Sequence, residues 1–365
     1  MSRRWLQQFH LGVECIHGVC LGLCFGLSFW GIKVSGAEGV MDAIASLVQG
    51  SAAPELPRFT VELAPPDLSP WLAGNTGVRG FTSFAAPRSG PHVLILALIH
   101  GNELGGAIVL DAMLRSKLRP TRGRLTLGFA NLDAFARFDA ENPIASRFID
   151  EDMNRVWDRA TLDGPRRSRE LDRAREIRPI IDTVDWVLDL HSMLWPSDPL
   201  LLCGEGARSK ALALAIGTPG LVVADGGHAG GRRLIDYPRF TAATGDAASV
   251  LVEAGQHWRT PTVEQMQASV TALLHHAGML DAGPDIKMTP PPPRFAEVTR
   301  VITATTGRFA FVRPFRGGEV IPARGTLLAH DGSAEIRTPY DDCLMVMPSH
   351  RTGRGHTAVR LARFS

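Results

Sequence analysis

Three side chains that follow apolar segments could hold a metal ion together. His100 and Glu103 come after residues 93–99, which are continuously apolar, and His191 follows the largely apolar residues 186–190. Catalytic zinc sites use imidazole nitrogen and carboxylate oxygen as three protein ligands and keep a fourth position open. In an α/β sheet, such sites assemble at the carboxyl ends of the strands. The sequence therefore predicts one Zn²⁺ per chain, bound by His100, Glu103 and His191.

The spacing of His100 and Glu103 is a weak signal by itself. A chain with twelve histidines contains a carboxylate three residues after one of them about as often as not. Either histidine alone could simply cap a strand end, but their shared position after an apolar segment favours a metal site. Asp189 lies on the same strand face as His191, where it could orient that imidazole or serve as a buried structural carboxylate.

A further carboxylate follows the apolar residues 250–252. Glu253 ends this segment, and Gly255 then allows the chain to turn. A glutamate beside zinc can take a proton from the attacking water as a general base. The alternative for Glu253 is a salt-bridged residue at a strand end.

The residues between these segments include a polar, irregular stretch at 142–155. An arginine can grip a carboxylate with two parallel hydrogen bonds, and one near a metal can stabilise the oxyanion formed during hydrolysis. Arg147 and Arg155 are the candidates in this stretch. The alternative interpretation is a solvated surface loop.

Apolar and helical segments alternate along the chain, and this alternation predicts an α/β fold with a parallel or mixed sheet. A short strand is also expected at Arg58–Leu63. The apolar segments are residues 93–99, 125–130, 186–190, 200–203, 220–223 and 250–252, and the helical stretches are near 104–118, 169–183, 209–216 and 263–276.

The length of 365 residues predicts more than one domain. Residues 55–280 are expected to form the catalytic domain. A proline-rich linker at 281–295 follows, because four consecutive prolines there favour a stiff extended chain. Short alternating segments in residues 296–365 predict a small all-β domain.

The first forty residues differ from the rest. Arg3 and Arg4 precede a mostly apolar stretch that ends before small residues, as in a signal peptide. Charged residues and glycines interrupt the stretch, so no stable membrane anchor is expected. Met41 is the alternative start of the protein. A cytoplasmic location is therefore expected, or export if residues 1–37 are a genuine signal.

The composition excludes some partners. A net charge of +2 offers no field for binding a polyanion, so nucleic acid is not expected as a partner. Three of the five cysteines lie in the first 24 residues, and no disulfide framework is implied. The expected partner is a small-molecule carboxylate, and a homo-oligomer remains open.

Taken in order, the candidate residues resemble the succinylglutamate desuccinylase and aspartoacylase family, a branch of the zinc carboxypeptidase fold. The resemblance covers roughly residues 85–350 and implies a three-layer α/β/α domain with a mixed sheet, followed by the small β domain. It rests on His100-Gly-Asn-Glu103, Arg147, Asn154-Arg155, Asp189-Leu-His191 and Glu253.

The resemblance also implies roles for these residues. The zinc ligands would be His100, Glu103 and His191, and Glu253 would be the base. Arg147 would polarise the scissile carbonyl, while Asn154 and Arg155 would hold the substrate carboxylate. The sequence departs from the family where substrate identity is set, at residues 225–237 and 256–258, so the acyl group is not predicted. Roles for His228, Arg232, Tyr237 and Tyr340 remain open.

Three functions compete at this point. The favoured one is zinc-dependent hydrolysis of an amide bond in an N-acyl amino acid or related small carboxylate. A second is a zinc carboxypeptidase or amidase acting on peptides or cell-wall fragments, which the same chemistry allows. A third is a zinc-binding or ligand-binding protein without activity, which the placement of Glu253 argues against.

Overall fold

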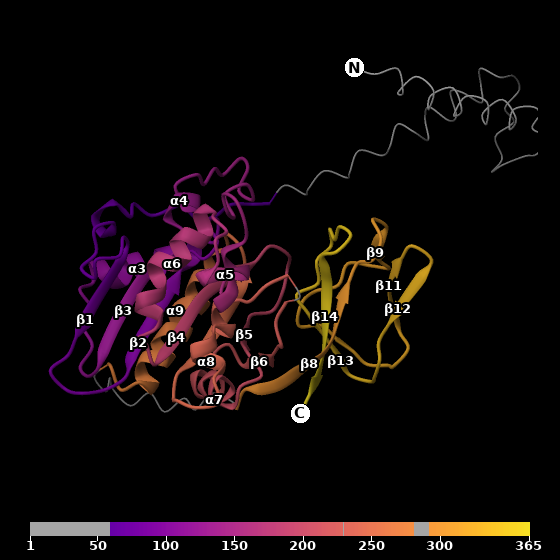
Figure 1. Ribbon diagram of the computed structural model, residues 1–365. Coiled ribbons are helices and arrows are strands. Elements are labelled where there is room, and N and C mark those ends of the chain that lie inside the picture. The colour runs from indigo at the N-terminus through magenta and orange to yellow at the C-terminus, as the bar shows by residue number, and fades with distance from the viewer. Residues whose placement is uncertain (1–58, 229, 281–291) are drawn as a thin grey trace, which may run out of the picture. The chain divides into compact units, whose positions relative to one another are not determined.

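A mixed sheet of eleven strands forms the framework of the protein in a computed structural model (Figure 1). The structure describes residues 59–228, 230–280 and 292–365. The expectations for residues 1–40 and for most of the proline-rich linker lie outside these ranges. The strand order is β1-β3-β2-β4-β7-β5-β6-β8-β14-β13-β10. Those strands are β1 (Phe81–Ala85), β2 (His92–Ala97), β3 (Arg124–Phe129), β4 (Trp186–Met193), β5 (Leu200–Cys203), β6 (Leu221–Ala224), β7 (Ala248–Gln256), β8 (Arg294–Thr303), β10 (Val320–Ile321), β13 (Cys343–Val346) and β14 (Thr357–Phe364).

Parallel pairs occupy the centre of the sheet. β2 pairs in parallel with both β3 and β4, β4 with β7, and β5 with β6. β1 and β5 run antiparallel to their neighbours β3 and β7. The predicted mixed sheet is therefore confirmed. Parallel strands must be covered on both faces, and this accounts for the continuous apolar runs in their sequences.

Helices cover both faces of the sheet, so this part of the protein has three layers (Figure 1). Alternate residues of β2 point to opposite sides. Val93 and Ile95 belong to the core cluster that includes residues of α3, α7 and α9, whereas Leu94 and Leu96 belong to the cluster that includes residues of α6. The α-helices are α3 (Leu104–Arg115), α4 (Leu132–Phe135), α5 (Arg159–Asp163), α6 (Arg169–Ile181), α7 (Ala207–Ile216), α8 (Pro238–Thr241) and α9 (Thr260–His276), with short 3-10 turns η1 (Ser69–Trp71), η2 (Met153–Arg155) and η3 (Leu234–Asp236).

The C-terminal region is all β, and part of it continues the large sheet. β8 pairs in parallel with β6, and β14, β13 and β10 follow in antiparallel order. A separate three-stranded sheet contains β9 (Phe309–Phe311), β11 (Leu327–Asp331) and β12 (Ala334–Arg337). Residues 60–365 form one compact unit.

The prediction of a strand at Arg58–Leu63 is wrong for the residues of this range that the structure describes, 59–63. Residues 59–63 have no regular secondary structure. The backbone N–H of Glu62 donates to the carbonyl of Trp258 at 2.9 Å. Strand propensity alone does not form a strand where no neighbouring strand supplies a ladder of hydrogen bonds.

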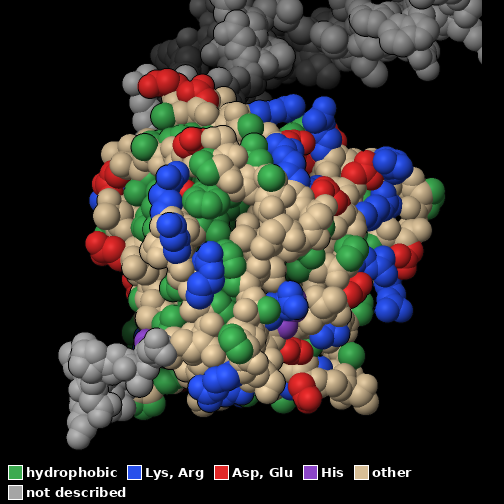
Figure 2. Space-filling model, turned by 90° about the vertical axis from the view of Figure 1, so that its left-hand side faces the viewer, with side chains coloured by type: hydrophobic (Ala, Val, Ile, Leu, Met, Phe, Trp, Pro, Cys, Tyr) green, Lys and Arg blue, Asp and Glu red, His purple; other side chains and the backbone are tan. Residues whose placement is uncertain are grey.

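Surface charge agrees with the small net charge of the chain. The face shown in Figure 2 carries basic and acidic side chains interspersed with apolar ones. In the described ranges, no helix combines the length and apolar character needed to cross a bilayer. Cys203 and Cys343 are both buried free thiols.

Candidate metal centre

The three predicted metal ligands lie together in the structure. Nδ1 of His100 is 2.8 Å from Oε1 of Glu103, and Nδ1 of His191 is 3.1 Å from Oε2 of the same carboxylate. All three side chains are buried, and their ligand atoms lie within 4.8 Å of one another. Atoms bound to one zinc at about 2.0–2.2 Å are roughly 3–3.5 Å apart. The donor set therefore has suitable spacing for such an ion.

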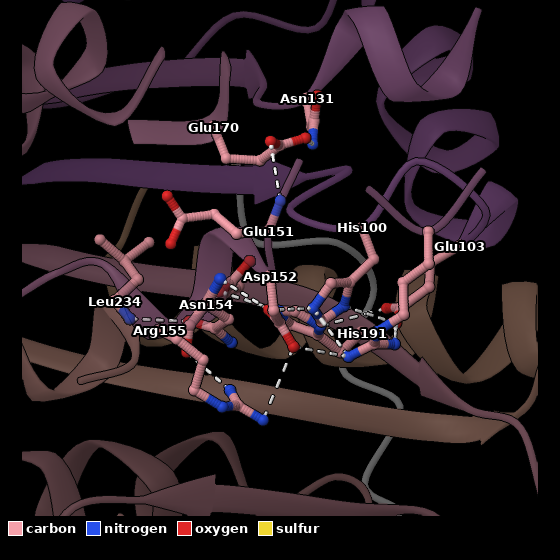
Figure 3. Close-up of polar contacts among 12 residues, drawn as sticks. His100, Glu103, Asn131, Glu151, Asp152, Asn154, Arg155, Glu170, His191 and Leu234 are labelled. Atoms are coloured by element: carbon pink, nitrogen blue, oxygen red, sulfur yellow. Dashed lines mark hydrogen bonds and ion pairs between the residues drawn. The ribbon is translucent and has the colours of Figure 1, made fainter. Parts of the chain in front are cut away.

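The second nitrogen of each imidazole faces another carboxylate. His100 Nε2 is 2.9 Å from Oδ1 of Asp152 (Figure 3). His191 Nε2 is 2.9 Å from Oδ2 of Asp189. The second contact lacks hydrogen-bond geometry, and neither oxygen of Asp189 accepts a hydrogen bond from a described residue. A carboxylate behind a metal-binding imidazole fixes its orientation and increases its basicity. The surroundings of both histidines therefore fit a zinc ion.

Backbone constraints bring His100 and Glu103 to one point. Leu98, just after β2, has a φ of 63°, a left-handed conformation that few residues other than glycine adopt. A Cβ on Gly101 would lie 2.4 Å from backbone atoms of Ala134 and Phe135 in α4, so this close approach requires glycine. Glu103 is the N-cap of α3, but its side chain makes no capping bond and faces the histidines instead. The helix N-terminus favours its negative charge.

The charged forms of Glu103 and His191 stabilise one another. Burial raises the pKa of Glu103, but the nearby His100 and His191 lower it by more. The pKa of Glu103 therefore lies well below its usual range. Burial lowers the pKa of His191, but Asp189 and Glu103 together raise it well above its usual value. A dication would satisfy the same carboxylates while displacing the proton from the imidazole.

Arg147 borders the centre. Its Nη2 lies 2.9 Å from Nε2 of His100 and 3.2 Å from Oδ2 of Asp152, and its Nη1 lies 3.5 Å from Oε1 of Glu103. The backbone N–H of Gly101 donates to the carbonyl of Arg147 at 3.0 Å, which joins the two segments directly. The stretch containing Arg147 therefore faces the candidate metal ligands and is not a loop surrounded by solvent.

Glu170 on α6 fixes this irregular stretch in place (Figure 3). It is fully buried, and its carboxylate accepts hydrogen bonds from the backbone N–H groups of Ile149 at 2.7 Å, Asp150 at 3.0 Å and Glu151 at 3.3 Å. The side-chain amide of Asn131 donates to it at 3.0 Å. These bonds satisfy backbone groups that have no helix or strand partner.

Asn154 and Arg155 lie in η2, directly after Asp152. The side-chain oxygen of Asn154 accepts a hydrogen bond from the N–H of Leu234 at 2.8 Å, which leaves its amide nitrogen as the group able to donate to a ligand. Arg155 donates to the carbonyl of Asn154 at 2.6 Å and lies 3.6 Å from Asp152. Its side chain is 27% exposed, so a ligand can reach it.

Glu253 lies beside His191. The two residues are register partners in the parallel pairing of β4 and β7, so their side chains leave the sheet on the same face. Oε2 of Glu253 is buried and accepts no hydrogen bond from the residues described. Burial raises the pKa of Glu253 to about 8, and a nearby dication would lower it again.

Several residues of the site had no role in the sequence interpretation. They include Asp152, Glu170 and a buried pair in which Ser192 Oγ lies 2.6 Å from Nδ1 of His257. The backbone N–H of Ser192 also donates to Glu103 at 3.0 Å. No periodicity separates Asp152 from the acidic residues just before it, so only the tertiary structure identifies it.

The four residues with open roles lie in different places. The buried Tyr237 hydroxyl donates to Asp182 at 2.8 Å, and the Tyr340 hydroxyl lies 2.6 Å from Oγ1 of Thr299. Both hydroxyls therefore have hydrogen-bond partners within the protein. His228 and Arg232 line a separate cavity of about 690 Å³.

Comparison with known proteins agrees with this architecture. Residues 89–277, just over half of the chain, match the family model of the succinylglutamate desuccinylase/aspartoacylase catalytic domain. The chain belongs to this family. Family membership supports hydrolysis of amide bonds in N-acyl amino acids, as expected from the sequence. None of the curated proteins matches the chain.

Several solved structures share the fold. Succinylglutamate desuccinylase from Vibrio parahaemolyticus is 18% identical, with a TM-score of 0.62 over 78% of this chain and 86% of that one. The succinylglutamate desuccinylase/aspartoacylase from Rhodobacter sphaeroides is 19% identical, with a TM-score of 0.59 over 78% and 88%. The product-bound ectoine utilization protein EutE from Ruegeria pomeroyi is 17% identical, with a TM-score of 0.57 over 77% and 88%.

Proposed function

We propose that this family member is a zinc-dependent hydrolase that cleaves the amide bond of an N-acyl amino acid or a related small carboxylate. One observation carries the zinc assignment. Two imidazoles turn their Nδ1 atoms toward the Glu103 carboxylate at 2.8 and 3.1 Å, while their Nε2 atoms face Asp152 and Asp189. Two histidines and a glutamate, with a carboxylate behind each histidine, are typical of a catalytic zinc site.

Zinc bound by His100, Glu103 and His191 would polarise the scissile carbonyl and make water a better nucleophile. Asp152 and Asp189 hold the two imidazoles in the orientation that the ligand set needs. Glu253 accepts the proton of the attacking water and passes it to the departing amine nitrogen. Its buried Oε2, without a hydrogen bond from the residues that the structure describes, supports this role.

The substrate is held by groups from the 142–155 stretch. Arg147 donates to the scissile carbonyl oxygen as negative charge develops on it. The substrate carboxylate is bound by the amide nitrogen of Asn154 and the guanidinium of Arg155. The Asn154 nitrogen donates to no acceptor among the described residues, and the Arg155 side chain is partly exposed. Asp152 contacts both arginines and keeps them at their separation, with distances of 3.2 and 3.6 Å.

Metal analysis joined to a substrate screen tests this function. The purified protein should hold about one zinc per chain, and the double variant His100→Ala/His191→Ala should lose it. A panel of N-acyl amino acids, together with dipeptides and cell-wall peptide fragments, should show turnover with the N-acyl amino acids. Zinc retained by the double variant would refute the metal assignment, and turnover of peptides alone would favour a carboxypeptidase or amidase.

A further inference from the structure

A cavity of about 180 Å³ adjoins the candidate metal centre. Arg147 and Glu253 line it on the side of the reaction centre, and Ser192, which follows His191, lines it nearby. The opposite walls come from two segments that are distant in sequence. One follows β4 at residues 193–197, and the other joins β13 to β14 at residues 347–349.

The walls of this cavity are mainly apolar and uncharged. Six apolar side chains line it, namely Met193, Leu194, Trp195, Pro196, Met347 and Pro348. Arg147 and Glu253 are the charged groups among the described residues that line it. His257 is buried, which lowers its pKa to about 4, so the imidazole is neutral near pH 7 and is engaged with Ser192 at 2.6 Å.

Positive charge is concentrated elsewhere in the site. Arg155 is absent from the cavity lining but lies close to Asp152, which also contacts Arg147. Arg147 therefore stands between a guanidinium region suited to a carboxylate and a cavity suited to an uncharged group. A substrate with one carboxylate and one apolar end matches this division.

Contacts with the C-terminal region hold the apolar walls in place. Asp198 N donates to the carbonyl of Gly317 at 2.8 Å, Gly317 N donates to the carbonyl of Pro196 at 3.2 Å, and Arg316 pairs with Asp198 at 2.8 Å. A Cβ on Gly317 would lie 2.0 Å from Oγ of Ser197, so the two segments meet without space for a side chain.

Backbone strain marks the second wall. Met347 has a φ of 47°, a left-handed conformation that is unfavourable for a residue with a long side chain. Such conformations persist where the surrounding structure enforces them, and they are common at ligand sites. The surrounding structure therefore fixes the backbone of this wall at Met347.

We propose that this cavity binds the acyl group of the substrate and selects an uncharged aliphatic or aromatic acyl group over one with a second carboxylate. The inference rests on the proposed deacylase function. A carboxylate in this cavity would lose its hydration and would meet Glu253, while Arg147 is already engaged with the scissile carbonyl. Burial of a charge without a partner is strongly unfavourable, whereas apolar groups gain from contact with these walls.

Steady-state kinetics on a matched series tests the inference. The zinc-loaded protein would be assayed with the acetyl, butanoyl, benzoyl and succinyl amides of each of several amino acids. The kcat/KM for the butanoyl or benzoyl compound should exceed that for acetyl by about 10-fold or more, and that for succinyl by about 100-fold or more. Preference for the succinyl compound would overturn the inference but leave the deacylase function standing. Absence of hydrolysis across the whole series would refute the deacylase function itself, and the inference with it.

A charge placed in the cavity tests the same point by gain of function. Leu194→Arg should increase the ratio of kcat/KM for succinyl to that for butanoyl by about 10-fold or more. Val312→Arg adds the same charge at a site 47% exposed and outside the cavity lining, and it should leave the ratio unchanged. Ser349→Arg on the other wall provides a second variant if Leu194→Arg does not fold. An unchanged ratio in a folded cavity variant would contradict the proposal.

Discussion

Two buried clusters in this protein combine carboxylates with cationic groups, but they differ in how completely their atoms are paired. In the candidate metal centre, both oxygens of Asp189, Nε2 of His191 and Oε2 of Glu253 lack hydrogen bonds from described residues. The second cluster, Asp225–Arg233–Asp236–Arg360, joins the end of β6 to η3 and β14. None of the buried side-chain nitrogen or oxygen atoms of these four residues lacks a partner.

The difference separates a site from a structural support. Arg233 lies 2.9 Å from Oδ2 of Asp225 and 2.7 Å from Oδ2 of Asp236, and Arg360 reaches the same oxygen of Asp225 at 2.8 Å. A buried network in which every group is paired makes the fold rigid, whereas unpaired buried groups need another explanation, such as a bound ion. We therefore expect variants of the first cluster to change activity and variants of the second to change stability.

The largest effect is expected for Glu253→Gln, which keeps the shape of the side chain but cannot accept the proton of water. The kcat should fall by about 10² to 10⁴-fold. Zinc content should stay near one per chain, and thermal unfolding should show no loss of stability because no hydrogen bond to Oε2 is broken. Unchanged turnover with zinc bound would assign Glu253 to a structural role and would weaken the contrast between the clusters.

Arg233→Met should have the opposite character. It leaves the buried Asp236 without its arginine and leaves Asp225 with Arg360 alone, and removal of one member of a buried ion pair costs about 3–5 kcal/mol. Denaturant unfolding should show this loss. Arg232→Met is the matched control, since the neighbouring arginine is exposed and should change the free energy of unfolding by less than about 0.5 kcal/mol. Equal stability of both variants would refute the structural role of the cluster.

Arg147 and Arg155 test the division of labour inside the site. Arg147→Ala should lower kcat by about 10² to 10³-fold, because it removes stabilisation of the charge that develops during reaction. Arg155→Ala should mainly raise KM, because a group that holds the carboxylate equally throughout the reaction contributes uniform binding. Replacement by lysine keeps the charge but loses the two-pronged geometry. Small and indistinguishable effects in both alanine variants would show that neither guanidinium contacts the substrate.

The smallest effect is expected for Glu170→Gln, because Glu170 acts through the stretch that it holds. The amide keeps one acceptor but faces its nitrogen toward backbone N–H groups, so stability should fall by about 1–3 kcal/mol. Displacement of Arg147 should lower kcat by about 10-fold, with a smaller change in KM. Glu176→Gln, at an exposed position of the same helix, should change neither quantity. A loss of stability with unchanged kcat would limit Glu170 to a folding role.

Local patterns were sufficient to predict the main elements. The apolar residues 93–99 coincide with β2 at His92–Ala97, and the helix expected near 104–118 is α3 at Leu104–Arg115. Apolar runs and helical periodicity depend on neighbours in sequence, so they are visible in a single chain. The prediction of a strand at 58–63 was wrong because a strand needs a neighbouring strand, and the sequence does not show which segments become neighbours.

The same distinction applies to the site. The ligand candidates were recognised because each follows an apolar segment, and the structure brings His100 and His191 to ring centroids 5.0 Å apart. Asp152 and Glu170 could not be identified from local patterns. Asp152 contacts His100, which is 52 positions away, and Glu170 binds backbone groups about 20 positions away. The pairing of β6 with β8 across the proline-rich segment was equally hidden, since it depends on how the two parts of the chain meet.

That parallel pairing of β6 with β8 bears on how the protein could be re-engineered. The strands that carry the candidate ligands and the strands that flank residues 347–349 belong to one hydrogen-bonded sheet but are not neighbours in it. Substitutions at residues 347–349 therefore change a wall of the cavity without changing the sequences of β2, β4 or β7. A library confined to this turn would sample new substrate preferences on an unchanged reaction centre.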